Sequence, residues 1–486
     1  MKSSTWILLT AGLVILYAPS VRAQLKGTNL AEFQYGNIPG MEPSGLTSLY
    51  NQLNLSYRHK FITIKGRIET FQPSHSEERS YTRLSQFSAK YSREGLYLQA
   101  GSIYQTIGRG ILLRNYELPS SIWEDIGYRV RYGFYKDLQG LSAGYTSENF
   151  QVKLMRGRVL AVDLPPTFER LERRPDLVEA AEANYTLKDH TLGLAFMRQT
   201  NQGASSNYAT AYLEGFINYI SYYAEYAFGN NDARAIYGSL AFSGERIGIS
   251  LEYKDYKNFL IGTGISDPPT LVKEHSSRLL NRSTHVPILS NESGYQADIS
   301  FQINPGNRIN LNHSLAKNIL SEEISYTFSE YYIDLESFIN ETWYGKVFGD
   351  YSRDPFKAEN QRITAGIILE KELNEFTVGT DLEAQSITRD FGESQNLVNY
   401  YASLSLKKGS KYGVTAIFEI SDDPFLLDEG ETQITYPGII FDYQPVHSTK
   451  LSLFAGKRRG GPACNSGVCY EVLDFEGIEL RISTIF

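Results

Sequence analysis

Hydrophobic and polar residues alternate along most of the chain. In 295–303, Tyr295, Ala297, Ile299, Phe301 and Ile303 alternate with Gln296, Asp298, Ser300 and Gln302. The same alternation is found in 61–71, 245–254 and 478–486. A spacing of two places alternate side chains on opposite faces of a pleated strand, and helical spacing fits none of these segments. The pattern predicts an all-β protein.

A second pattern indicates that these strands cross a membrane. The polar faces carry charges of both signs, which a soluble sandwich would also show. However, aromatic residues gather near strand ends, as with Tyr222, Tyr226 and Phe228, where membrane interfaces place them. The segments are also about 10–12 residues long, the length of a tilted membrane-spanning strand, whereas soluble strands run about 5–6 residues.

Very short and longer connections alternate between the predicted strands. Short turns are predicted at 58–60, 92–94, 187–190, 243–244, 304–307, 373–374, 407–411 and 444–447. Longer connections are predicted at 72–81, 105–126, 160–179, 258–292, 354–360, 422–432 and 458–469. Outer-membrane barrels have short periplasmic turns and long outer loops. We therefore predict a closed antiparallel transmembrane β-barrel.

The predicted barrel has about 24 strands, from Asn29–Gly36 to Tyr470–Phe486, with a margin of about two. The number depends on Leu138–Arg158, which we interpret as one long strand with a bulge near Ser147 and Glu148. A hairpin there would make the number odd, and single-chain bacterial barrels usually have an even number.

Composition supports a single large β domain behind an export signal. The 486 residues include 35 Tyr, 25 Phe and 40 Gly, and the formal charge of −8 gives no indication of a nucleic-acid surface. Lys2, the apolar run from Trp6 to Tyr17 and the small residues Val21 and Ala23 predict a signal peptide over 1–23. An N-terminal membrane anchor is the alternative. We expect 24–486 to form one barrel domain in the cell outer membrane.

The last residues are typical of a membrane-targeting strand. Ile478, Leu480 and Ile482 lie on one face and lead to the terminal aromatic Phe486. This arrangement resembles the C-terminal strand of outer-membrane barrels. It predicts contact with the barrel-assembly machinery through this strand, and with outer-membrane lipid around the barrel.

Three stretches resemble an uncharacterised family of large single-chain Gram-negative outer-membrane β-barrel proteins. They are Leu98–Tyr116, Asp267–Pro287 and Gly456–Phe486. The resemblance implies the fold and the membrane. It implies no substrate and no functional residues.

Charged residues on the predicted inner wall are candidates for lining a pore. They are Lys65, Arg67, Glu69, Arg129, Arg131, Glu252, Lys254, Asp298, Arg362, Asp381, Glu383, Glu479 and Arg481. Such residues either set solute or ion preference or form ion pairs between neighbouring strands. Because both signs are present, strong anion or cation selectivity is not predicted.

The only two cysteines, Cys464 and Cys469, are separated by four residues near the end of the chain. In an exported protein this spacing predicts a disulfide, which would stabilise by about 2 kcal/mol and stiffen an exposed loop. Lys457, Arg458 and Arg459 precede it. They form either a contact for lipopolysaccharide phosphates or a solvated basic loop.

Two long connections are candidates for narrowing the barrel. Asn258–Glu292 is the longest and either enters the lumen as a constriction or caps the mouth. Within it, Glu274, His275 and His285 are alternative metal ligands, although we predict no metal and no cofactor. Gln105–Ile126 is the second candidate.

The sequence therefore favours a pore or solute-binding channel of unknown substrate, with small solutes and lipopolysaccharide as partners and no nucleic acid. The alternative is a structural or accessory barrel with a filled lumen that serves a secretion or surface-assembly complex. An outer-mouth hydrolase is a further alternative. We predict that the protein is not an enzyme, because no motif joins His75, His275 or His285 to a nucleophile.

Overall fold

The computed structural model describes residues 25–74, 79–124, 129–160, 173–259, 261, 271–285, 291–321, 324–390, 392–427, 430–465 and 468–486, with the backbone alone for 160, 173–175 and 462–471. The predicted signal peptide lies outside these residues. The helical elements are α2 (Arg278–Arg282) and the short 3-10 helices η4 (Pro355–Lys357) and η5 (Pro424–Leu426). Among the described residues, no helix is both long and apolar enough to cross a membrane.

The strands account for most of the described chain. They are β1 (Leu25–Asn37), β2 (Thr47–His59), β3 (Ile62–Pro73), β4 (Tyr81–Arg93), β5 (Leu96–Ile103), β6 (Tyr116–Glu124), β7 (Arg131–Lys136), β8 (Leu138–Thr146), β9 (Phe150–Leu160), β10 (Arg173–Leu187), β11 (His190–Asn201), β12 (Ala204–Ile217), β13 (Ile220–Gly229), β14 (Arg234–Ser243), β15 (Ile247–Lys257), β16 (Glu292–Asn304), β17 (Asn307–Ile319), β18 (Ser325–Asn340), β19 (Trp343–Asp354), β20 (Glu359–Leu373), β21 (Phe376–Asp390), β22 (Ser394–Lys408), β23 (Tyr412–Ser421), β24 (Ile434–Val446), β25 (Thr449–Arg458), β26 (Gly461–Asn465), β27 (Val468–Val472) and β28 (Phe475–Ile485).

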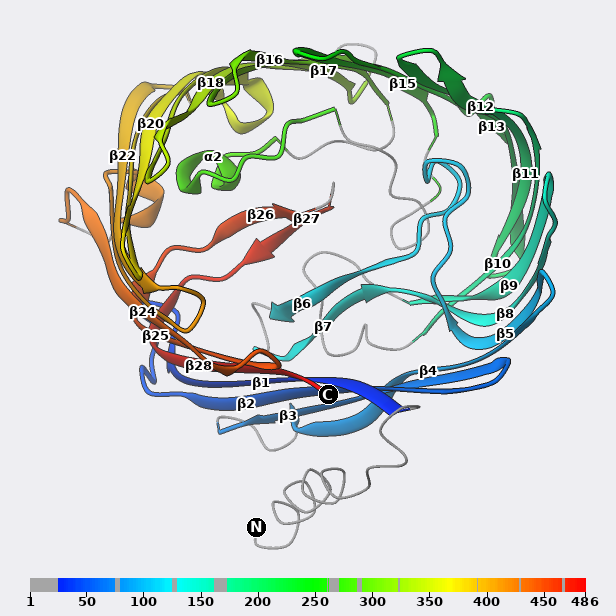
Figure 1. Cartoon of the computed structure of the whole chain (residues 1–486), viewed down its shortest axis with the longest axis horizontal. Coiled ribbons are helices and arrows are strands. Elements are labelled where there is room, and N and C mark those ends of the chain that lie inside the picture. Colours follow the sequence, from blue (N-terminus) through cyan, green and yellow to red (C-terminus); the bar gives the residue numbers. More distant parts are fainter. Residues whose placement is uncertain are drawn as a thin grey trace, which may run out of the picture.

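Twenty-four of these strands form one antiparallel sheet that closes on itself (Figure 1). The seam joins the first and last wall strands, because β1 pairs with β2 on one side and with β28 on the other. Gly27 and Phe486 exchange two backbone hydrogen bonds of 2.8 and 2.9 Å across it. The predicted closed barrel and its number of strands are confirmed.

The predicted single strand over Leu138–Arg158 is wrong. These residues form the hairpin β8–β9, in which Thr146 faces Gln151 and the Ser147 amide donates to the Phe150 carbonyl. The number of wall strands is nevertheless even, because β6 and β7 are not part of the wall and β5 pairs directly with β8. Alternation alone does not distinguish a wall strand from a hairpin strand packed on the wall.

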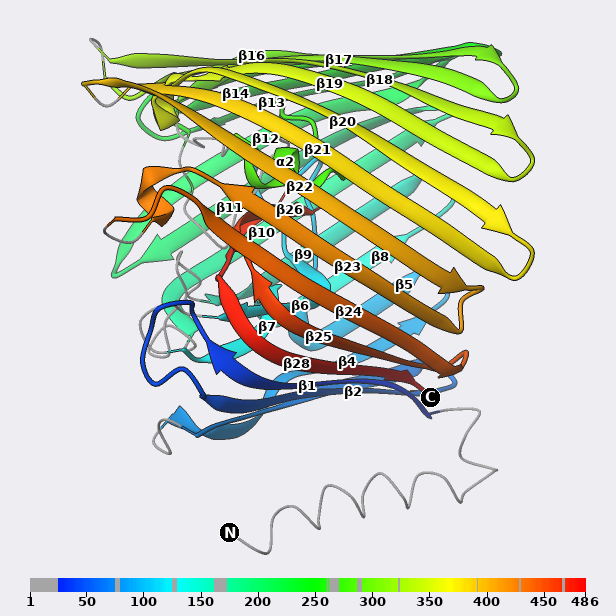
Figure 2. The ribbon, with the colours of Figure 1, turned by 90° about the vertical axis from the view of Figure 1, so that its left-hand side faces the viewer.

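The connections differ sharply between the two ends of the barrel (Figure 2). At one end every turn has two or three residues, such as Lys60 and Phe61 between β2 and β3. At the other end the connections are mostly longer, and two of them, between β5 and β8 and between β15 and β16, are the longest. The predicted short turns all lie at the first end.

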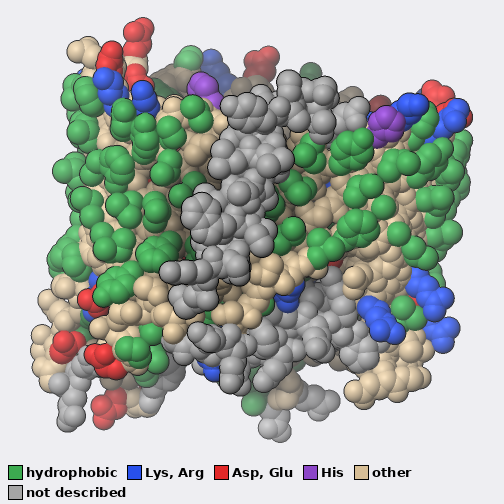
Figure 3. Space-filling view, turned by 90° about the horizontal axis from the view of Figure 1, so that it is seen from below, with side chains coloured by type: hydrophobic (Ala, Val, Ile, Leu, Met, Phe, Trp, Pro, Cys, Tyr) green, Lys and Arg blue, Asp and Glu red, His purple; other side chains and the backbone are tan. Residues whose placement is uncertain are grey.

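The outward face of the wall is apolar. Tyr295, Phe301 and Leu251 are each more than 40% exposed, while Arg67 and Glu69 of the alternate positions on β3 are buried. In Figure 3 hydrophobic side chains are spread over the visible parts of the wall, and most charged ones lie toward its upper and lower rims. This apolar band is the surface expected against lipid. It includes His313, which stacks on Tyr331 with ring centroids 4.2 Å apart.

Two rows of paired glycines bend the wall. In one row Gly36 faces Gly477, which faces Gly456 on the next strand; a Cβ added to Gly477 would lie 2.1 Å from the Tyr35 carbonyl oxygen. In the other row Gly140 faces both Gly101 and Gly157. Glycine allows such close approach and marks corners in barrels. Between the two rows the wall runs flat along β1–β4, at the bottom of Figure 1.

Candidate functional site

Three connections from the long-loop end turn back into the lumen (Figure 1). We call β6–β7 the lumenal hairpin, residues 271–285 with α2 the lumenal segment, and β26–β27 the terminal hairpin. The described part of the Asn258–Glu292 connection therefore lies in the lumen, as a constriction would, and does not cap the mouth of the barrel. The Gln105–Ile126 region also enters the lumen.

The terminal hairpin differs from the prediction of an exposed loop. It lies inside the barrel, where the arginines that precede it contact α2 and the wall. The backbone of Cys464 faces that of Cys469 in the β26–β27 register. Their side chains lie outside the described part of the chain, so the disulfide stays a prediction.

An aromatic cluster fixes the lumenal hairpin on the flat part of the wall. Trp123, Tyr132 and Phe134 are buried together with Tyr50 of β2 and Phe71 of β3. The ring of Trp123 meets that of Phe134 edge-on, with centroids 3.9 Å apart. Burying several aromatic side chains in one cluster stabilises by several kcal/mol, with each side chain contributing about 1.5–3.

Ion pairs add to this attachment. Arg131 is buried and pairs with Glu32 of β1, which also binds Arg481 at 2.5 Å. Arg129 binds Glu124 within the hairpin at 2.5 Å and donates to Asn37 of β1. The prediction that Arg129 and Arg131 belong to the inner wall is wrong, because the alternation around them belongs to a strand inside the lumen.

The chain between β5 and β6 covers the wall of β10–β15. Its Ile107, Ile111 and Leu113 are fully buried in a cluster with wall side chains. The amides of Gly108 and Arg109 donate to Glu182 at 3.3 Å and Glu225 at 3.2 Å. This part of the lumen is therefore closed by apolar packing as well as by hydrogen bonds.

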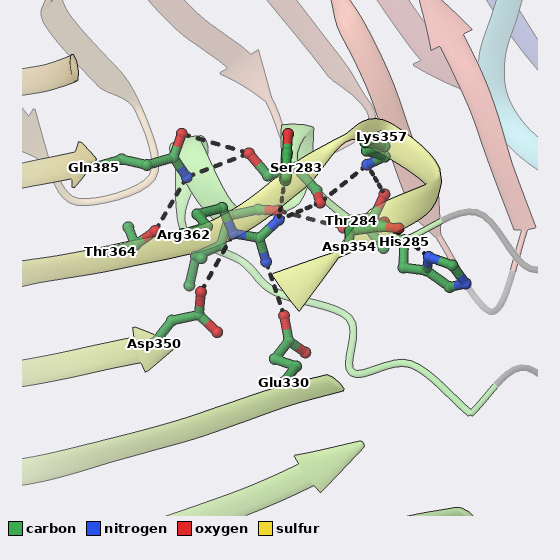
Figure 4. A network of polar contacts seen from close by, with 12 residues as sticks. Ser283, Thr284, His285, Glu330, Asp350, Asp354, Lys357, Arg362, Thr364 and Gln385 are labelled. Atoms are coloured by element: carbon green, nitrogen blue, oxygen red, sulfur yellow. Dashed lines mark hydrogen bonds and ion pairs between the residues drawn. The ribbon is translucent and has the colours of Figure 1, made fainter. Parts of the chain in front are cut away.

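A network of polar contacts attaches the lumenal segment to the wall (Figure 4), beside two small apolar clusters around Val272 and Leu280. The amides of Arg278 and Leu279 donate to the carboxylate of Glu383 on β21, at 2.6 and 2.7 Å. Arg362 of β20 donates to the Ser283 carbonyl at 2.6 Å. Lys357 of η4 donates to the Thr284 carbonyl at 2.7 Å.

Cations from two lumenal elements meet near α2. Arg282 binds Glu419 of β23, and Arg459, which precedes the terminal hairpin, lies 3.4 Å from the same carboxylate. Arg278 donates to the Arg459 carbonyl at 3.0 Å. Burial, together with the neighbouring Arg282 charge, lowers the pKa of Arg278 to about 10. Burial likewise lowers the pKa of Lys357. These charges are costly to keep out of water, so Glu419 is important for holding the segment.

Most remaining residues of the predicted pore lining also have partners. Lys254 binds Glu292 at 2.5 Å, Asp298 binds Lys273 at 3.0 Å, Glu479 binds Arg458 at 2.6 Å, Glu252 accepts from Tyr237 at 2.6 Å, Glu69 accepts from Gly133 at 2.6 Å, and Arg67 binds Glu117. Asp381 lies two residues before Glu383 on β21, and Lys65 lines an open cavity. Much of the predicted lining therefore contacts neighbouring strands or the lumenal elements. Its effect on ion preference stays a prediction.

Three cavities remain around the lumenal elements. One of about 970 Å³ lies beside the lumenal hairpin and is lined by Lys26, Lys65, Arg67 and Lys90 against one acid, Glu117. One of about 440 Å³ is lined by part of the lumenal segment and four acids, Glu274, Asp298, Asp334 and Glu336, against Lys273 and Lys346. One of about 210 Å³ lies beside Arg282 and Lys357.

Sequence reasoning missed Glu330, Asp350 and Asp354. They occupy inward positions of β18 and β19 and contact Arg362 or the two lumenal histidines. The same alternation that identified Arg362 also predicts that these three residues face inward, so they could have been identified as lumen-facing residues. Their convergence depends on the register between β18, β19 and β20, which the sequence does not specify.

The fold is thus an outer-membrane type of β-barrel whose lumen holds three folded connections. A model of a family of unknown function, DUF6029, matches residues 34–486. The chain belongs to this family.

The chain is also similar to solved barrel structures. The P pilus usher PapC translocation pore has 11% identity and a TM-score of 0.49 over 95% of this chain and 98% of that chain. The outer membrane protein OpdK of Pseudomonas aeruginosa has 13% identity and a TM-score of 0.40 over 74% and 99%. The copper transporter OprC has 9% identity and a TM-score of 0.43 over 95% and 80%. No curated protein matches the chain.

Proposed function

We propose that this protein is a gated channel of the cell outer membrane for small polar solutes, with the lumenal segment as the gate. The observation that carries the proposal is the way this segment is held. Hydrogen bonds and ion pairs hold its backbone from 278 to 284 on the wall, and its apolar clusters with the wall are small. It also borders cavities of about 440 and 210 Å³. Polar contacts can exchange with water more readily than a packed apolar core.

The charged cavities support a polar solute. Four cationic side chains line the cavity of about 970 Å³, and four acidic side chains line the cavity of about 440 Å³. An apolar solute would have to displace water from these groups without replacing its hydrogen bonds. The solute itself is not identified by these features.

The accessory barrel with a filled lumen is the second candidate. The aromatic cluster around Trp123 and Phe134 favours it, because a packed hairpin permanently occupies part of the lumen. Contacts with lipopolysaccharide and with the assembly machinery stay predictions, as does the absence of enzymatic activity.

Conductance in planar bilayers separates these candidates. Glu383→Ala removes the acceptor of the Arg278 and Leu279 amides. We expect wild-type protein to open rarely and this variant to open more often and for longer. Asp442→Asn is the matched control, because Asp442 pairs with Lys450 of the neighbouring wall strand and contacts no lumenal element in this ion pair. If wild type and both variants are equally silent in folded form, the accessory barrel is the better interpretation.

A further inference from the structure

Three buried side chains converge where the lumenal segment meets the wall. His275 belongs to the segment, Glu330 to β18 and Asp350 to β19. The His275 Nε2 atom lies 3.2 Å from the Glu330 Oε2 atom, and one ligand atom from each of the three residues lies within 4.8 Å of the other two. All three side chains are at least 98% buried.

The carboxylates of Glu330 and Asp350 each have one oxygen near Arg362, and the second oxygen of each faces the junction. Arg362 lies 3.1 Å from Glu330 Oε1 and 3.4 Å from Asp350 Oδ1. The other oxygens, Glu330 Oε2 and Asp350 Oδ2, and the His275 Nε2 atom face one another at the junction, and none of the three has a hydrogen bond to a group outside it. Buried polar atoms that meet only one another need a shared proton or a cation between them.

The charge around the junction is also unbalanced. Four buried acids surround it, Glu330, Asp350, Asp354 and Glu359, with two buried cations, Arg362 and Lys357. Arg389 also lies 3.7 Å from Glu359, so three cations face four carboxylates and negative charge is left over. A bound cation would neutralise it.

We propose that His275, Glu330 and Asp350 bind a divalent first-row transition-metal ion, with Zn²⁺ as the representative ion. An imidazole nitrogen and two carboxylate oxygens are a ligand set that such ions accept. Ligand atoms around a tetrahedral Zn²⁺ are about 3.3 Å apart. The distance of 3.2 Å between His275 Nε2 and Glu330 Oε2 fits this geometry. The Asp350 side chain would move closer to these two atoms when the ion binds.

The acidic cavity of about 440 Å³ gives access to this site. His275 is among its lining residues, together with the acids Glu274, Asp298, Asp334 and Glu336. A cavity with an excess of acids raises the local concentration of cations. Because His275 belongs to the segment and the two acids belong to the wall, the bound ion would tie the segment to the wall.

Titration of the purified, folded barrel with Zn²⁺ tests the site without reference to gating. We expect wild-type protein to bind one Zn²⁺ per chain, and His275→Ala to weaken binding by about 100-fold or more, because one of three protein ligands is lost. Co²⁺ should give the visible absorption of a low-coordinate nitrogen and oxygen site in wild type only.

His285→Ala is the matched control. It removes the other histidine of the same segment, which pairs with Asp354 at 2.8 Å outside the three ligands, and its affinity should stay within about threefold of wild type. Glu330→Gln replaces His275→Ala if the latter does not fold, as judged by heat-modifiable gel mobility. The proposal is overturned if wild type shows no stoichiometric Zn²⁺ binding, or if the ligand variants bind as wild type does. If Glu383→Ala changes the conductance but the wild-type protein binds no Zn²⁺, the proposed gate is supported and the proposed metal site is rejected.

Discussion

The lumenal hairpin and the lumenal segment occupy the same barrel but are held by different forces. The hairpin buries Trp123, Tyr132 and Phe134 against Tyr50 and Phe71, and the buried Arg131–Glu32 ion pair adds to this packing. The segment packs Val272 and Leu280 in two small apolar clusters with the wall and also buries Leu271 and Leu279. Its backbone is held by polar bonds from Glu383, Arg362 and Lys357. Under the proposed function, the hairpin is the permanent filling and the segment is the one that moves.

The largest expected effect comes from Arg362→Met. This change leaves Glu330, Asp350 and Glu359 buried without their shared cation and removes the bond to the Ser283 carbonyl. We expect a loss of about 3–5 kcal/mol, measured by urea unfolding in lipid vesicles. Trypsin should then cut after Arg278 and Arg282 while the hairpin stays protected. Continued protection of both arginines in a folded variant would contradict an electrostatically held segment.

Arg131→Met should have a smaller effect although Arg131 is equally buried. Glu32 keeps Arg481 at 2.5 Å and Glu124 keeps Arg129 at 2.5 Å, so neither acid is left alone. We expect a loss of about 1.5–3 kcal/mol and no new tryptic cleavage after Arg129 or Lys136, because the aromatic cluster keeps the hairpin in place. Cleavage at these sites would show that the hairpin also depends on its ion pairs.

The smallest effect is expected for Lys450→Ala. Lys450 pairs with Asp442 at 3.4 Å, both side chains are more than a third exposed, and neither belongs to a lumenal element. We expect a change of about 0.2–1 kcal/mol and an unchanged tryptic pattern. A larger loss would mean that wall ion pairs alone account for the effects above.

Much of the fold could be predicted from alternation, because lipid outside and polar groups inside impose a period of two on every wall strand. The outward positions of Tyr295 and Ile478 follow from it. The predicted number of wall strands agrees because two errors cancel: Leu138–Arg158 forms two wall strands, and the strand that contains Arg131 lies in the lumen. Alternation failed at Arg129 and Arg131, because a hairpin that packs one face on the wall has the same period. It also failed at Ser147–Asn149, where a three-residue turn was interpreted as a bulge.

The candidate site was predictable only in part. His275 and His285 were identified as residues of the long connection, but their grouping with Glu274 is not what the structure shows. His275 meets Glu330 and His285 meets Asp354, on strands far along the chain. Such contacts depend on how a 15-residue stretch, 271–285, lies across the barrel, and no local rule of sequence specifies that path.

The two glycine rows have a consequence for the cross-section of the barrel. A round 24-stranded cylinder would offer a concave floor, on which a two-stranded ribbon touches only along its edges. The bends at Gly477 and Gly140 make the wall between them nearly flat. The lumenal hairpin β6–β7 packs on this flat part as the second layer of a small β-sandwich. Side chains at these glycines would push the neighbouring strands apart and make the cross-section rounder. The lumenal hairpin would then lose part of its contact with the wall, so the shape of the barrel and the packing of its interior depend on the same residues.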